Sequence, residues 1–259
     1  MRDVLPGEYY LVPRVNNAVP AGSGIFGINR IPVDIRDRDI TGLAIELVPS
    51  QIVTGILTID GRAPGVATVR VAIGAVGNPS PTYQGISARA VVANPDDGTF
   101  NLGNAAQTRY RLETVAGPPD LYVSDLRVGA VTAFDTGFEV GKEPMPPLQI
   151  SLRSGAGTVE GIVRDSANKP IANAMIVVVP PEARRENRVL YKTATSDAAG
   201  KFTVRGIAPG SYKVFAFEGL AGGEFYNSRF LSKYESRGKS INVGQGGTTT
   251  ESLTIIESN

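Results

Sequence analysis

The chain contains no cysteine, no histidine and no tryptophan among its 259 residues. Without cysteine it can form neither disulfides nor thiolate metal sites. Without histidine, the usual Ser-His-Asp and Cys-His arrangements and the common zinc sites cannot be built. The composition therefore excludes the commonest nucleophilic and zinc-dependent enzymes. We expect no catalytic activity, no metal and no cofactor.

Net charge and long apolar runs are also missing. Twenty-six Lys and Arg residues against 25 Asp and Glu leave a net charge of +1, which gives no reason to expect nucleic acid as a partner. No apolar run approaches the about 18 residues of a membrane helix, so we expect no membrane insertion. Residues 1–7 do not resemble a signal peptide. An exported protein would therefore carry its signal upstream of this sequence.

Turn residues and alternating apolar residues are abundant. The 30 Gly and 18 Pro are dispersed along the chain, as in a turn-rich all-β protein. The stretch Asp197–Ala216 is the clearest example, because apolar and polar residues alternate as in strands with one buried face. Its elements are a turn at Gly200, a strand around Phe202, a turn at Pro209-Gly210 and a strand around Tyr212.

This pattern recurs along the chain. Five landmarks stand 102 positions before their counterparts: Gly98, Phe100, Leu102, Tyr110 and Leu112 precede Gly200, Phe202, Val204, Tyr212 and Val214. A partial third copy begins at Pro6-Gly7. A period of about 100 residues is too long for a solenoid repeat but fits tandem sandwich domains. The repeat predicts tandem immunoglobulin-like or transthyretin-like antiparallel β-sandwiches.

Three domains follow from this register: 1–47, 48–152 and 153–259, with residues 153–157 as a short linker. The first corresponds only to the C-terminal half of a sandwich, with strands expected at Glu8–Val15 and around Leu43. Such a piece buries too little apolar area to fold alone. Either the chain is a piece of a longer protein, or another chain completes the half-domain by adding strands to its open edge.

The two complete copies are expected to be almost entirely strand. Helix is predicted only near residues 228–237, where Ser228 would cap it and Gly238 would end it. In the first copy the expected strands are Ile52–Ile59, Val69–Ile73, Ser87–Ala93, those around Phe100 and Tyr110, Tyr122–Val128 and Leu148–Leu152. In the second copy they are Val159–Val163, Met175–Val179, Leu190–Thr195, Phe202–Val204, Tyr212–Ala216 and Leu253–Ile255.

Several motifs of the last domain resemble a known family. They are Val159–Val163, Lys169–Ala174, Thr195-Ser196-Asp197 with Gly200-Lys201-Phe202, and Ile207–Tyr212. This pattern is similar to the carboxypeptidase regulatory-like domains, a transthyretin-like β-sandwich family. The resemblance covers 153–259 well and 48–152 partially, since Ala106-Gln107-Thr108 stands where Pro-Gly is expected. It implies a non-proteolytic accessory module of a secreted or surface protein, often bacterial, and hence an extracellular or cell-surface location.

The charged candidates are interpreted structurally. Asp96, Asp97 and Asp197 stand at turns, where Asp is favoured by hydrogen bonds from its side chain to the backbone. A calcium site at the first two, or a hydrolase using two carboxylates, remains a formal alternative. The one basic cluster is expected to be a solvated loop; it consists of Arg184, Arg185 and Arg188.

Aromatic residues supply the remaining candidates. Three tyrosines recur at one position of the repeat, which predicts a shared core role; they are Tyr9, Tyr110 and Tyr212. Tyr83, Phe225 and Tyr226 do not recur, and the latter two, if exposed, would stack on a sugar or a neighbouring subunit. The alternative for this pair is packing of the following helix onto the sandwich.

These expectations predict a non-catalytic structural or adhesive module of an exported bacterial protein. It would be a subunit of an extracellular fibre or surface assembly, with protein partners provided by self-association or by neighbouring domains. The alternative is an accessory module of a larger secreted protein that binds carbohydrate or protein through the loops with Tyr83, Phe225 and Tyr226.

Overall fold

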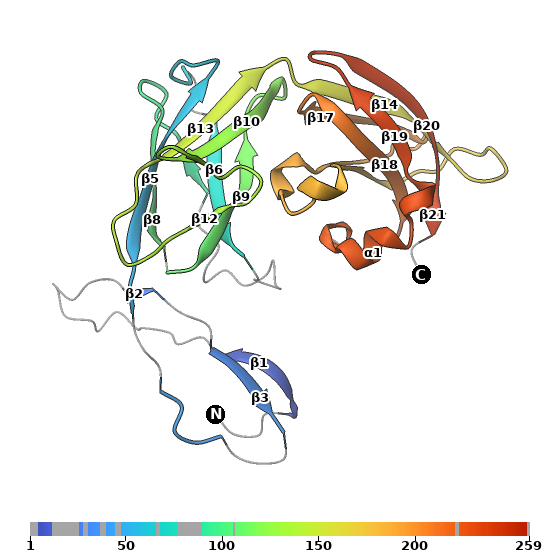
Figure 1. The fold of residues 1–259 in the computed structure, drawn as a ribbon. Coiled ribbons are helices and arrows are strands. Elements are labelled where there is room, and N and C mark those ends of the chain that lie inside the picture. Colours follow the sequence, from blue (N-terminus) through green and yellow to red (C-terminus); the bar gives the residue numbers. More distant parts are fainter. Residues whose placement is uncertain are drawn as a thin grey trace.

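The computed structural model describes residues 5–11, 26–27, 31–36, 40–44, 48–65, 68–76, 90–105, 107–220 and 223–257. Two β-sandwiches lie side by side, and a short N-terminal ribbon lies apart from them (Figure 1). The predicted all-β fold class is confirmed. No helix among the described residues is long and apolar enough to cross a membrane.

The first sandwich consists of two sheets. One has the strand order β11-β10-β13-β5-β8, the other the order β12-β9-β6-β7. The strands of the first sheet are β5 (Gln51–Ile59), β8 (Thr99–Ala105), β10 (Leu121–Val128), β11 (Val131–Thr132) and β13 (Leu148–Ser154). Those of the second are β6 (Arg70–Ala75), β7 (Val91–Val92), β9 (Arg109–Ala116) and β12 (Phe138–Glu139).

The second sandwich has the sheet orders β17-β14-β20 and β16-β15-β18-β19, with β21 pairing on β18. The first sheet contains β14 (Gly157–Arg164), β17 (Lys201–Ile207) and β20 (Thr248–Thr254). The second contains β15 (Met175–Val179), β16 (Lys192–Thr195), β18 (Gly210–Glu218), β19 (Lys239–Val243) and β21 (Ile256–Glu257). The non-strand elements are η1 (Glu182–Arg184), η2 (Arg188–Leu190), η3 (Glu224–Tyr226), α1 (Ser228–Ser232) and η4 (Glu235–Arg237).

The two sandwiches share one strand order. β13-β5-β8 corresponds to β20-β14-β17, and β12-β9-β6-β7 to β19-β18-β15-β16. In both, the pair formed by the first and last of these strands in sequence is parallel, β5 with β13 and β14 with β20. Because strand periodicity does not reveal strand direction, the sequence predicted antiparallel sandwiches and did not predict these two parallel pairs. The turn at Asp96-Asp97-Gly98 forms, closed by the hydrogen bond from the Gly98 amide to the Asn94 carbonyl oxygen at 2.8 Å, and it joins β7 and β8, which lie in different sheets.

Each sandwich encloses its own apolar core. Tyr110 is 2% exposed in the first core and Tyr212 is 5% exposed in the second, as the repeat predicts. A third apolar cluster covers the outer face of β15 and β18, where Phe215 and Phe217 lie. β15 is therefore buried on both faces.

The repeated glycines are required by close approaches between strands. Gly98 has φ +75° and Gly200 has φ +74°, a region that favours glycine. A Cβ on Gly98 would overlap the Leu57 carbonyl oxygen, and one on Gly200 would lie 2.7 Å from the Val163 carbonyl oxygen. At both positions the two strands are also hydrogen-bonded: the Leu57 amide donates to the Gly98 carbonyl oxygen, and the Val163 amide donates to the Gly200 carbonyl oxygen, each at 2.8 Å.

The helical predictions need two corrections. Asn227, and not Ser228, caps α1, since its side chain accepts hydrogen bonds from the backbone amides of Arg229 (2.9 Å) and Phe230 (3.4 Å). Leu190 lies in the 3-10 helix η2, so the strand predicted from it begins only at Lys192. The sequence also did not predict β19 after Gly238.

The N-terminal ribbon consists of β1 (Gly7–Leu11) and β3 (Ile31–Ile35), which pair antiparallel; β2 (Phe26–Gly27) pairs with β4 (Val48–Pro49). Tyr9 is 40% exposed, so the predicted core role is wrong for this copy of the tyrosine. Leu43 lies outside any strand and is 45% exposed. The half-domain assignment of 1–47 remains a prediction.

We predict that Gly98→Ala lowers the free energy of unfolding of the first sandwich by about 3 kcal/mol, because strain at positive φ adds to the overlap with Leu57. Gly61→Ala is the matched control. Gly61 has φ +79° but no atom within 4 Å of an added Cβ, so strain alone should cost about 1 kcal/mol. Urea unfolding of both variants measures the difference, and equal costs would contradict this explanation.

Candidate functional site

The segment 180–191, which joins β15 to β16, leaves the second sandwich and reaches the first. We call it the docking loop; it contains η1 and η2. It lies between the two sandwiches as the gold segment of Figure 1. Because interfaces between domains of one chain are commonly small and polar, relative motion is the default unless specific contacts oppose it. The contacts of this loop are therefore the candidate site.

A valine and an asparagine form the buried centre of the contact. Val189 is 7% exposed and belongs to the core cluster of the first sandwich, although it comes from the second. Asn187 is 2% exposed. Its Nδ2 donates hydrogen bonds to the Phe134 carbonyl oxygen at 2.9 Å and to Asp135 Oδ1 at 3.0 Å. Removing either partner would leave buried polar atoms unsatisfied.

Three ion pairs surround this centre and cross between the sandwiches. Arg184 Nε lies 3.0 Å from Asp135 Oδ1, Arg188 Nη1 lies 2.9 Å from Glu113 Oε1, and Arg111 pairs with Glu186. The Arg184 guanidinium also lies over the Phe134 ring, 5.4 Å from its centroid. Their side chains keep between 23% and 73% exposure, so each pair contributes only tenths of a kcal/mol. Together they fix the register of the contact.

The basic cluster is thus not the solvated loop that was expected. Arg184 and Arg188 bind carboxylates of the first sandwich, and Arg185 binds inside the second. Arg185 Nη2 donates to both carboxylate oxygens of Glu235 at 3.0 Å. The Tyr191 hydroxyl donates to the Arg185 carbonyl oxygen at 3.1 Å. The loop is therefore anchored on its own sandwich before it reaches the other.

The surroundings of the docking loop shift the pKa values of Glu235 and Tyr191. The hydrogen bonds from Arg185 hold the pKa of Glu235 below its ordinary value, and Lys213, whose Nζ lies 2.8 Å from Glu235 Oε1, adds to this effect. Burial raises the pKa of Tyr191 to about 12. Tyr191 therefore keeps its proton, and with it the hydrogen bond to Arg185, throughout the physiological range.

A short connection on the other side of the junction limits the freedom of the sandwiches further. β13 runs to Ser154 and β14 begins at Gly157, so the expected linker shrinks to Gly155 and Ala156. The Ala156 amide donates to the Asp120 carbonyl oxygen at 2.8 Å. The Ser154 hydroxyl donates to Asp60 Oδ2 at 2.6 Å, and this bond lowers the pKa of Asp60.

The aromatic candidates differ in how far they are exposed to solvent. Phe225 is only 6% exposed and lies in the third apolar cluster, so of the two alternatives the packing one holds for it. Tyr226 is 36% exposed, but the Arg188 guanidinium lies 4.9 Å from its ring centroid and the Tyr191 ring packs at 5.0 Å. Tyr83 lies outside the described residues. Packing is thus the observed role of the pair, and ligand contact remains a prediction.

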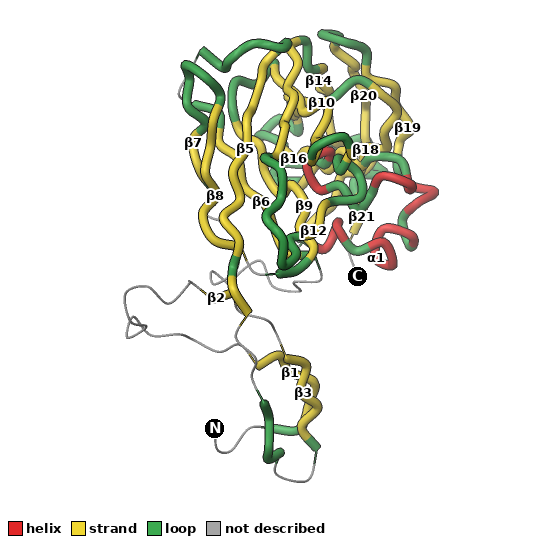
Figure 2. The backbone as a smooth tube through the Cα atoms, turned by 60° about the vertical axis from the view of Figure 1, so that its left-hand side comes forward, coloured by secondary structure: helices red, strands yellow, loops and turns green. Residues whose placement is uncertain are grey.

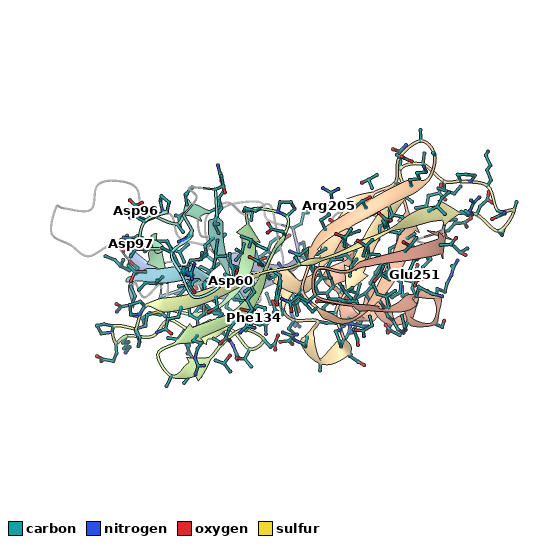
Figure 3. All side chains as sticks on the ribbon, turned by 90° about the horizontal axis from the view of Figure 1, so that it is seen from above. Asp60, Asp96, Asp97, Phe134, Arg205 and Glu251 are labelled. Carbon is teal, nitrogen blue, oxygen red and sulfur yellow. The ribbon has the colours of Figure 1, made fainter. Side chains whose placement is uncertain are left out.

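The acidic candidates stabilise the turns in which they lie by accepting hydrogen bonds from nearby residues. Asp97 Oδ1 accepts hydrogen bonds from the Thr99 amide at 2.8 Å and hydroxyl at 2.7 Å, which lowers the pKa of Asp97. Asp197 Oδ1 likewise accepts from the amides of Ala199 and Lys201. Asp96 and Asp97 lie at the far side of the first sandwich, whereas Phe134 lies beside the second (Figure 3). Within the described ranges, no three His, Cys, Asp or Glu side chains group as a metal site would require.

Comparison with a known family agrees with the second sandwich. Residues 158–255 match the sequence model of the carboxypeptidase regulatory-like domain. The resemblance inferred from the motifs is therefore confirmed over these residues, and the match is confined to the second sandwich. No curated protein matches the sequence significantly.

Among solved structures, the chain is similar to a streptococcal ancillary pilin (14% identity, TM-score 0.29, covering 99% of this chain and 76% of that one). It is also similar to the Bacillus anthracis TIE protein (12% identity, TM-score 0.28, covering 89% of this chain and 37% of that one). A third similar structure is the shaft pilin SpaA from Lactobacillus rhamnosus GG (12% identity, TM-score 0.27, covering 79% of this chain and 97% of that one). TM-scores this low carry no argument about the arrangement of the whole chain or its function. The fold assignment rests on the strand pairing above.

We predict that Asn187→Ala lowers the free energy of unfolding by about 1–3 kcal/mol, because it removes both hydrogen bonds made by an almost completely buried side chain. Asn242→Ala, at an exposed position of β19, should change it by less than about 0.5 kcal/mol. Hydrogen exchange should show faster exchange at the docking loop only in the first variant. Equal behaviour of the two variants would contradict the buried-amide interpretation.

We also predict a pH dependence at Glu235. Because its folded pKa lies below the unfolded value of about 4.3, its contribution to stability is present above that value and is lost as pH falls through the folded pKa. Arg185→Gln should raise the pKa of Glu235 toward the ordinary value in an NMR titration of the carboxyl carbon. Arg205→Gln, at an exposed position of β17, is the control and should leave it unchanged.

Proposed function

We propose that this chain is a non-catalytic structural module of an exported bacterial protein, a rigid unit within an extracellular fibre or surface assembly. The observation that carries the proposal is the docking loop, whose Asn187 and Val189 are buried against the first sandwich. A module that transmits position or force needs its domains fixed relative to one another. Tandem sandwiches with a free hinge would not provide this.

The use of charge at the junction supports the same proposal. Glu113, Asp135 and Glu186, the carboxylates at the junction, each pair with an arginine across it. Catalytic carboxylates are typically held in a cleft with an open side toward substrate. These carboxylates instead hold one sandwich against the other. The setting outside the cell rests on the resemblance of the second sandwich to a family of accessory modules.

The alternative, a module that binds carbohydrate, depends on an accessible aromatic face. Tyr226 is the one described member of the predicted trio that keeps substantial exposure, at 36%. Its ring is in contact with Arg188 and Tyr191, which leaves less of its face for a sugar. This geometry favours the structural role over the carbohydrate one.

Sedimentation velocity of the full chain over a wide concentration range, together with a glycan array, tests the proposal. We expect association that grows with concentration and no glycan binding. A species that stays monomeric at the highest concentration would remove the fibre version. Glycan binding that is lost in Tyr226→Ala but kept in Tyr122→Ala would replace the structural function by the carbohydrate one.

A further inference from the structure

The outer faces of β9 and β18 are equivalent positions of the repeat. In β9, Tyr110 and Leu112 point into the core, so Arg111 and Glu113 point outward. In β18, Tyr212 and Val214 point into the core, so Lys213, Phe215 and Phe217 point outward. The neighbouring strands β6 and β15 complete these two faces. We call them the β9 face and the β18 face.

The β9 face is small, charged and occupied by the neighbouring sandwich. Gly74 on β6 pairs with Arg111, and a Cβ on Gly74 would overlap the Glu113 side chain. Arg111 binds Glu186 and Glu113 binds Arg188, both from the docking loop. This face therefore takes the loop of the sandwich that follows it in sequence.

The β18 face is large, apolar and occupied from within its own sandwich. Val177, Val179, Phe215 and Phe217 on this face are each at most 1% exposed. Residues 223–237, which we call the cap, contribute Phe225, Leu231 and Tyr234 to the cluster over this face, together with Tyr191, Leu220 and Ile256. The cap contains η3, α1 and η4, and α1 is labelled in Figure 2. The Phe217 ring centroid lies 5.7 Å from Phe230 and 5.4 Å from Tyr234.

In the second sandwich, an ion pair with the cap takes the place that the ion pair with the docking loop has in the first sandwich. Lys213 occupies the position on β18 that Arg111 occupies on β9, and its Nζ lies 2.8 Å from Glu235 of the cap. Where the first sandwich pairs Arg111 with a residue of its neighbour, the second thus pairs Lys213 with a residue of its own. Gly238 then lets the chain pass closely, since a Cβ there would lie 2.5 Å from the Phe215 ring.

We propose that the cap fills, in the second sandwich, the docking face that in the first sandwich receives a neighbour. Docking between the two sandwiches is therefore directional, because the loop of one sandwich binds the outer face of the sandwich that precedes it in sequence. The β18 face is covered by the cap and so accepts neither a further sandwich nor a second copy of the chain. Displacing the cap would expose a contiguous apolar surface of the kind that marks protein contacts. A second copy of this chain would then bind there.

The test combines a variant that opens the cap with two buried reporters. Leu231, 0% exposed in α1, is replaced by Asp, because a buried unpaired charge expels the segment that carries it. Val179→Cys lies in the cluster that the cap helps to bury, and Val178→Cys lies in the core between the sheets; both valines are 0% exposed. The chain has no other cysteine, so a thiol reagent reports on each position alone.

In the full-length chain, both cysteines should be protected while the cap is intact. We expect Leu231→Asp to speed labelling at position 179 by at least about tenfold and at position 178 by less than about twofold, because only the cap opens. Sedimentation velocity should then show concentration-dependent association beyond that of the parent chain. This comparison with the parent separates the inference from the fibre proposal, which concerns the intact chain.

Two results would overturn the inference. Equal acceleration at positions 178 and 179 would show that residues 223–237 are part of the folding core and not a separable cover. Selective opening at position 179 without any added association would show that the β18 face has no capacity to bind a second copy.

Discussion

Asn187 carries a polar side chain into the space between the two sandwiches, where it is almost completely removed from water. Its amide is satisfied only when the Phe134 carbonyl and Asp135 of the first sandwich are in place. Because an unsatisfied buried amide is costly, one relative orientation of the sandwiches is favoured over the others. Val189 adds apolar burial to this contact, and the two-residue connection at Gly155 and Ala156 restricts the alternatives.

One β-scaffold thus supports two kinds of contact on the same outer face. On β9 the outward side chains of Arg111 and Glu113 are charged, and a loop from the neighbouring sandwich binds them through Glu186 and Arg188. On β18 the side chains are Phe215 and Phe217, and the chain's own helical segment covers them. The core tyrosines Tyr110 and Tyr212 are buried in both copies, so the difference in what contacts the outer face comes from residues that alternate with the core.

The sequence predicted the elements whose signal is local. Strand alternation, the turn glycines and the repeat led to the sandwiches, and the buried roles of Tyr110 and Tyr212 are confirmed. The junction could not be found this way, because Arg188 and its partner Glu113 stand 75 positions apart and nothing local identifies them as a pair. The sequence also left open whether Phe225 is exposed or packed, because the apolar cluster that contains it includes Val177 and Tyr191 from earlier segments of the chain.

The docking loop holds the two sandwiches in one orientation, and the distance between them is the quantity to measure. Spin labels at Val131→Cys in the first sandwich and Ser240→Cys in the second would report the distance between them, since the chain has no native cysteine. We predict a single narrow distance distribution for this pair and a broad one after Val189→Asp is added. A distribution that is broad already with the intact loop, or one that Val189→Asp leaves unchanged, would contradict it.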